Sequence, residues 1–122
     1  MLRDPDNSTL VASAFRCFDH SRYLLHSSVI MPNHVHLLLT LDESADLGKT
    51  VASWKRFTAT KINRKDNRSG PVWQKDYFDR LIRNWEHFIN VARYIRRNPV
   101  KAKQRHGSFT LYEAPWVKRL LS

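Results

Sequence analysis

The chain has 122 residues, enough for one domain and hardly for two, and a domain of this size buries roughly two-thirds of its unfolded surface. Its 42% of hydrophobic residues can form a core, and a content of 3 glycines and 5 prolines argues against a disordered protein. The single cysteine, Cys17, cannot form an intrachain disulfide, which favours a reducing cytosol, and we expect neither a membrane span nor a secretory signal.

The net charge of +10 is distributed unevenly along the chain. Residues 1–46 carry three basic and six acidic side chains, whereas residues 47–122 carry 18 basic and five acidic ones. A strongly basic half indicates a polyanionic partner, most often nucleic acid. The alternative is a basic domain whose lysines are simply solvated.

The first part of the chain predicts a helix followed by a β-hairpin. Apolar residues at three- and four-residue spacing predict an amphipathic helix over residues 4–23. Residues 24–30 and 34–40 are typical of two strands, the second being the strongest strand signal in the chain. Residues 31–33, with their Pro and Asn, predict the turn between them.

The middle of the chain predicts a basic amphipathic helix and then a third strand. From Leu47 onward, apolar residues fall on one helical face, and lysines and arginines cover the rest of the helix. Residues 66–71 end this helix as a loop, and residues 72–82 predict one long or bent strand.

The last part predicts a strong helix over residues 85–97, capped by Asn84 and closed by Pro99. A short extended stretch at residues 109–112 and an amphipathic end follow. The order helix, strand, strand, helix, strand, helix predicts an α+β fold in which helices cover one face of an antiparallel sheet.

His34 and His36 are the first candidate site residues. Two positions apart on a strand, their imidazoles point to the same face, where they can chelate one divalent cation. Taken alone, such a pair is more often incidental.

Tyr94 and Asn98 are one helical turn apart on the last predicted helix. Tyr94 is expected at the edge of the apolar stripe, and Asn98 can offer an amide oxygen as a third metal ligand. The plain alternatives are a core-edge tyrosine and a helix-terminal asparagine before Pro99. The apolar stripe that would bury against the sheet consists of Phe88, Val91, Ala92 and Ile95.

Three segments, in this order, resemble motifs of the REP-associated tyrosine transposases, a single-tyrosine transposase family with an HUH motif. Residues 29–39, VIMPNHVHLLL, resemble the HUH strand, and residues 70–80, GPVWQKDYFDR, resemble the strand that follows. Residues 93–102, RYIRRNPVKA, are similar to the tyrosine helix and its Asn-Pro-Val stretch. The resemblance runs from about Leu2 to about His106, and three motifs are more specific than one.

The resemblance implies one domain over residues 1–122, with a ferredoxin-like or RRM-like sheet and a divergent tail from residue 107. It further implies a single-stranded DNA endonuclease and strand transferase that acts on hairpin-forming repeats through a 5′-phosphotyrosine. Tyr94 matches the nucleophile of the family. The residues that match the ligands of Mg²⁺ or Mn²⁺ are His34, His36 and Asn98.

The expected partner is single-stranded or hairpin DNA, not a membrane, in a bacterial cytoplasm and in association with the nucleoid. Trp73 and Tyr77 could stack on bases, although core packing explains them equally well. The candidate phosphate contacts are Lys55, Arg56, Lys61, Arg64, Arg96, Arg97, Lys101 and Lys103.

The start of the chain departs from the family pattern. Family members carry a strand before the first helix, whereas residues 1–5 correspond to the loop ahead of that helix. Without this strand the HUH strand would lack a partner. The chain is then a shortened or decaying copy, or it borrows a strand from a second copy in a homodimer, or it has rearranged.

Three functions compete at this point. The first is the metal-dependent transposase, and the second is a domesticated or defective relative that binds hairpin DNA or RNA without cutting. The third, a metalloenzyme unrelated to nucleic acid, lacks a further His, Asp or Glu ligand at characteristic spacing. The joint presence of Tyr94, His34, His36 and Asn98 favours the transposase.

Overall fold

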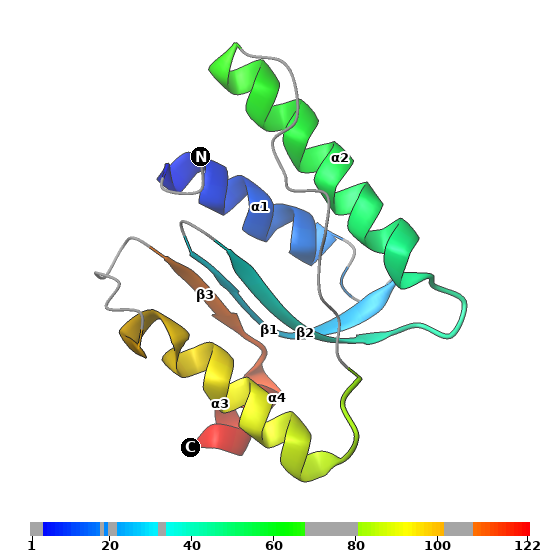
Figure 1. The fold of residues 1–122 in the computed structure, drawn as a ribbon, viewed down its shortest axis with the longest axis vertical. Coiled ribbons are helices and arrows are strands. Elements are labelled where there is room, and N and C mark those ends of the chain that lie inside the picture. Colours follow the sequence, from blue (N-terminus) through cyan, green and yellow to red (C-terminus); the bar gives the residue numbers. More distant parts are fainter. Residues whose placement is uncertain (1–3, 18, 20–21, 32–33, 68–80, 102–108) are drawn as a thin grey trace.

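The computed structural model describes residues 4–17, 19, 22–31, 34–67, 81–101 and 109–122. These residues form helices and strands in the order α1-β1-β2-α2-α3-β3-α4 (Figure 1). No helix in this part of the chain is long and apolar enough to cross a membrane. The bounds are α1 Pro5–Cys17, β1 Tyr23–Ile30, β2 Val35–Leu41, α2 Leu47–Asp66, α3 Trp85–Lys101, β3 Thr110–Glu113 and α4 Pro115–Leu121.

The sheet is antiparallel, with strand order β2-β1-β3. The predicted hairpin is confirmed: β1 pairs with β2 from Tyr23 opposite Leu41 to Ile30 opposite Val35. Within the described residues β2 pairs with β1 alone, so its other edge has no strand beside it there.

Helices cover both faces of the sheet, so the prediction of a single covered face is wrong. α1 and α2 lie on one side of the sheet, and α3 and α4 lie on the other (Figure 1). The reason is the central strand β1, which is buried along nearly its whole length and therefore needs cover on both faces. On one face the core consists of Val11, Phe15, Tyr23, Leu25, Ile30, Trp54 and Ile62. On the other it consists of Val29, Met31, Leu38, Ala92, Ile95, Ala114 and Val117.

Aromatic contacts join α1, β1 and α2 in the first of these cores. The Trp54 ring meets the rings of Phe15 and Tyr23 edge to face, with centroids 5.1 and 5.4 Å apart. Trp54 Nε1 donates to the Tyr23 hydroxyl at 3.1 Å, and that hydroxyl donates to the Phe15 carbonyl. Burial raises the pKa of Tyr23 to about 12, so its phenol stays protonated and keeps its hydrogen bond.

Helices α2 and α3 begin where the sequence indicates. The Asp46 carboxylate accepts from the Lys49 amide at 2.9 Å and caps α2, and Asn67 ends that helix in the left-handed conformation at φ 51°. The predicted cap of α3 is confirmed, because Asn84 Oδ1 accepts from the His87 amide at 2.8 Å.

Other boundaries differ from the predictions. Pro99 does not close α3, which continues to Lys101; the missing amide hydrogen costs a single bond in the last turn, and the Pro99 ring is fully buried. Helix α1 ends at Cys17, well before the predicted residue 23. The tail forms β3 and α4, as its extended and amphipathic stretches predict. The predicted strand at residues 72–82 lies outside the described residues, except for Leu81 and Ile82, which are in neither a helix nor a strand.

Candidate active site

His34 and His36 lie side by side at the beginning of β2. His34 directly precedes the strand, and His36 is its second residue. Their ring centroids are 4.9 Å apart at an interplanar angle of 80°. Along β2, His36 shares a face with Leu38, which is buried against α3 and α4, whereas Val35 packs into the opposite core. The prediction that both imidazoles lie on one face is confirmed.

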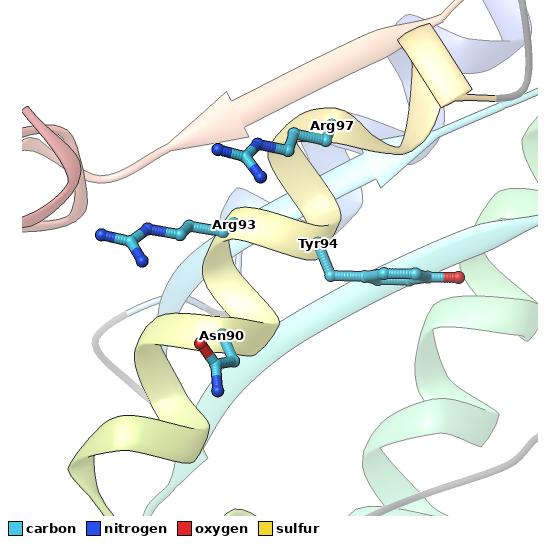
Figure 2. Close-up of a pocket in the computed structure, with 4 residues that line it drawn as sticks. All are labelled: Asn90, Arg93, Tyr94 and Arg97. Atoms are coloured by element: carbon cyan, nitrogen blue, oxygen red, sulfur yellow. The ribbon is translucent and has the colours of Figure 1, made fainter.

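Tyr94 of α3 lies over the same face of the sheet. The rings of His36 and Tyr94 meet edge to face, with centroids 5.6 Å apart at 87°. The Tyr94 side chain reaches from α3 across β2 (Figure 2), and the residue is 49% exposed. Tyr94 and the histidines therefore lie on the same face of the sheet. Had they been on opposite faces, a shared site would have been excluded.

The packing of α3 determines the position of Tyr94. Ala92 and Ile95 are completely or almost completely buried against the sheet. Each residue turns about 100° around a helix, so Tyr94 points to the edge of this buried stripe. The Tyr94 ring therefore rests on His36, while the residue as a whole stays about half exposed.

Asn98 follows Tyr94 by one turn of α3 and is 7% exposed. At that spacing it lies on the flank of α3 that carries Tyr94, closer to the buried stripe. This placement agrees with an amide that faces the sheet. Its role as a metal ligand stays a prediction.

The charge state of His36 suits a metal ligand. Burial lowers the pKa of His36, and the neighbouring His34 lowers it further. At neutral pH the ring is therefore neutral, with a lone pair available for a cation. The described residues contain no group of three His, Cys, Asp or Glu that could hold a metal. A cation between His34 and His36 would need oxygen ligands from an amide, such as that of Asn98, and from a phosphate of the substrate.

The predicted phosphate contacts divide between two helices. Arg56, Lys61 and Arg64 are exposed on α2, and Lys55 on the same helix is half-buried. Lys61 lies over the half-exposed ring of Phe57, with its ammonium 5.0 Å from the centroid. Arg97 is exposed on α3. The side chains of Lys101, Lys103, Trp73 and Tyr77 lie outside the described residues.

Arg96, another of the predicted phosphate contacts, is bound to a carboxylate of the chain itself. Its Nε and one terminal nitrogen each donate to the Glu113 carboxylate at 2.8 Å, and this hydrogen bonding raises the pKa of Arg96. Such a bidentate pair fixes the guanidinium geometrically. Arg96 therefore joins α3 to β3.

The structure also shows two residues that the sequence reasoning did not single out. A partly open hollow on the outer face of α3 is lined by Asn90, Arg93, Tyr94 and Arg97 (Figure 2). Their spacing of three, four and seven residues places them on one helical face. That spacing was the available signal for Asn90 and Arg93.

Comparisons with known proteins agree with this arrangement. Residues 2–98, which include all four candidate catalytic and metal-site residues, match the model of the family described as "Transposase IS200 like". An uncharacterized protein of Haemophilus influenzae is 28% identical over 97 residues, which cover 62% of this chain and 54% of the relative. A second protein of that species, named "Putative REP-associated tyrosine transposase", is 30% identical over 82 residues, 59% of this chain and 47% of the relative.

The chain thus spans about half the length of these curated relatives. No solved structure matches it. The family model, in contrast, covers most of the chain, from residue 2 to residue 98. The chain therefore belongs to the IS200-like transposase family.

Proposed function

We propose that the protein is a tyrosine transposase that cuts single-stranded DNA at hairpin-forming repeats and rejoins it, with Tyr94 as the nucleophile. The observation that carries the proposal is the contact between the rings of Tyr94 and His36 on one face of the sheet, 5.6 Å apart. A half-exposed phenol beside two adjacent imidazoles brings a nucleophile next to groups that can bind a divalent cation, and this supports the proposal.

In the cleavage step the Tyr94 oxygen attacks the phosphorus of a phosphodiester. The bond from phosphorus to the 3′-oxygen breaks, the phenol loses its proton, and the 3′-oxygen leaves as a hydroxyl. The product is a 5′-phosphotyrosine and a free 3′-hydroxyl end. Because one phosphodiester replaces another, the reverse attack by a 3′-hydroxyl can join a strand without an energy source.

His34, His36 and Asn98 would hold a divalent cation, Mg²⁺ or Mn²⁺. A free phenol has a pKa near 10 and is a weak nucleophile at neutral pH. When bound, the cation would orient the phosphate and neutralise the negative charge that develops on it. The chain's own contribution is the positioning of these groups: β2 holds His36, whose ring contacts that of His34, and the burial of α3 holds Tyr94 against His36.

Replacement of the nucleophile tests the proposal. Tyr94→Phe removes the phenolic oxygen and keeps the ring against His36, so fold and DNA affinity should hardly change. With a hairpin-bearing single strand and Mn²⁺, the wild type should give a covalent protein–DNA adduct on a denaturing gel, and the variant none. Tyr112→Phe, a half-buried tyrosine of β3, is the matched control and should keep the adduct. An adduct with Tyr94→Phe would mean that another residue is the nucleophile.

The metal site has its own test. His36→Ala, or a chelator with the wild type, should abolish the adduct and leave hairpin binding in place. The control is His87→Ala, at the start of α3, whose imidazole accepts from the Arg83 amide. If the folded wild type binds hairpin DNA but gives no adduct with any divalent metal, the protein is a binding module instead.

A further inference from the structure

Two arginines lie next to each other on the solvent face of α3. Arg93 and Arg97 are four residues apart and exposed, and like charges at this spacing destabilise a helix. In the described part of the chain neither forms an ion pair with a carboxylate. Arg96, by contrast, is held by two hydrogen bonds to Glu113. Arg93 and Arg97 thus repel each other without a carboxylate between them, whereas the neighbouring Arg96 has one. This difference indicates that an anionic ligand from outside the chain binds the pair.

The direction of the side chains limits what this ligand can be. The guanidinium groups of Arg93 and Arg97 extend from one flank of α3, whereas the Tyr94 phenol extends from the other flank, across β2 (Figure 2). The arginines therefore do not reach the phosphate that Tyr94 would attack. They would instead bind a second anionic group of the same ligand, at the place where that ligand crosses the outer face of the helix.

Given the proposed function, on which this inference rests, we propose that the hollow on α3 binds a second phosphate of the same single strand. Arg93 and Arg97 would each present a planar fork of donors to the phosphate oxygens, and the Asn90 amide would donate from the preceding turn. The hollow thus sets the position of the strand relative to Tyr94. Arg93, Arg97 and Asn90 are positioning residues, because none of them touches the reacting atoms.

The charges around the hollow agree with a phosphate ligand. Glu86 lies one turn before Asn90 and is exposed, and the Glu113 carboxylate is taken up by Arg96. Among the residues that the structure describes, the two exposed guanidinium groups thus face at most one exposed carboxylate along this surface of α3. An acidic peptide would also satisfy them, but a strand held at Tyr94 brings its own phosphates to within a few nucleotides of the hollow. This tethering raises their effective concentration.

Equilibrium binding tests the inference without any cleavage. The protein carrying Tyr94→Phe is titrated onto a labelled hairpin-bearing single strand at several salt concentrations. Adding Arg93→Gln and Arg97→Gln together should lower the slope of log affinity against log salt by about 0.7, since the two arginines share one phosphate and each phosphate contact on a single strand contributes about 0.7. Arg119→Gln, an exposed arginine of α4, is the matched control and should leave the slope unchanged. An unchanged slope in the double variant, or no binding by the parent protein, would overturn the inference.

A second measurement ties the hollow to strand position. In proteins with Tyr94 intact, the Arg93→Gln, Arg97→Gln pair should raise the DNA concentration for half-maximal adduct formation and leave the rate at saturation near that of the wild type. Removing the nucleotides on one side of the cleaved linkage should raise this half-maximal DNA concentration for the wild type. It should cause no further increase for the double variant. If the effects of trimming the DNA and of the two substitutions simply add, whichever side is trimmed, the hollow does not hold the flanking strand.

The two proposals fail in different ways. Adduct formation with an unchanged salt slope refutes the phosphate site and leaves the transposase intact. A reduced slope without any adduct refutes the cleavage mechanism and leaves the hollow as a nucleic-acid contact.

Discussion

His26 is held by two hydrogen bonds that determine which of its ring nitrogens carries the proton. Trp116 Nε1 lies 2.9 Å from Nδ1 of His26, and an indole nitrogen can only donate, so this Nδ1 is unprotonated. The proton is therefore on Nε2, which donates to the Thr40 hydroxyl at 2.8 Å. The three residues belong to α4, β1 and β2, so one neutral imidazole joins three elements.

This arrangement makes the fold sensitive to acid. Burial lowers the pKa of His26 below its ordinary value of 6.5, and the weaker effect of Asp19 acts in the opposite direction. Because the folded state holds His26 neutral, its stabilising effect is complete above pH 6.5 and is lost as the pH falls toward the lower folded pKa. Burial of His36 acts with the same sign. We expect a lower urea midpoint at pH 5 than at pH 7.5, and a pKa below 6.5 for His26 in an NMR titration.

Trp116→Phe isolates the hydrogen bond from the titration. It leaves Nδ1 of His26 without its donor and should lower the free energy of unfolding by about 1 kcal/mol. Trp85→Phe is the control: its ring is 63% exposed and stacks on Phe88, so its loss should change stability less. A pKa of His26 above 6.5, or equal effects of the two variants, would contradict the structure.

At the scale of the elements, the position of α3 depends on an ion pair with β3 as well as on its apolar stripe. Arg96 and Glu113 connect α3 to β3 across 17 residues of sequence. The Glu113 side chain is 7% exposed and that of Arg96 is 37% exposed, so the carboxylate carries most of the desolvation. Removal of the arginine would leave that carboxylate buried without its partner.

Arg96→Gln separates this structural role from a role in DNA binding. We expect a loss of about 1–2 kcal/mol in the free energy of unfolding, discounted for the exposure of the guanidinium, and no change in the salt slope of DNA binding. Urea unfolding and the oligonucleotide titration measure the two effects. The double variant with Glu113→Gln should recover part of the stability. A reduced salt slope in Arg96→Gln at unchanged stability would instead make this arginine a phosphate contact.

Local patterns predicted most of the elements and the placement of three candidate site residues on one face of the sheet. His34 and His36 share a face because a strand has a period of two, and Tyr94 lies at the edge of a stripe because a helix has a period near 3.6. The cover on both faces of the sheet was not predictable in this way. β1 carries His26, Ser27 and Ser28 in its middle and has a bulge between Leu25 and Ser27, so its sequence hides how completely it is buried. The ion pair of Arg96 was not predictable either, because its partner Glu113 belongs to a strand that only the tertiary fold brings near α3.

At the scale of the whole molecule, the aromatic core and the candidate site lie on opposite faces of the sheet. The face under α1 and α2 carries the aromatic cluster around Trp54, and the face under α3 carries the histidines and Tyr94. Most of the positive charge lies after residue 46, on α2, α3 and the later segments. The molecule therefore has basic helices on both sides of the sheet, which favours a polyanionic partner.

The exposed basic side chains of α2 should add a contribution that does not depend on sequence. Lys61→Gln or Arg64→Gln should weaken binding of every single-stranded or hairpin DNA by about the same factor and reduce the salt slope by about 0.7–0.9 each. The two residues are three positions apart on α2 and exposed, so neither change should unfold the protein. Titrations of two unrelated hairpins at several salt concentrations, with Arg119→Gln as control, measure this. A loss confined to one hairpin would mean that α2 reads bases, and an affinity independent of salt would rule out phosphate contacts as the basis of binding, because counterion release accompanies every such contact.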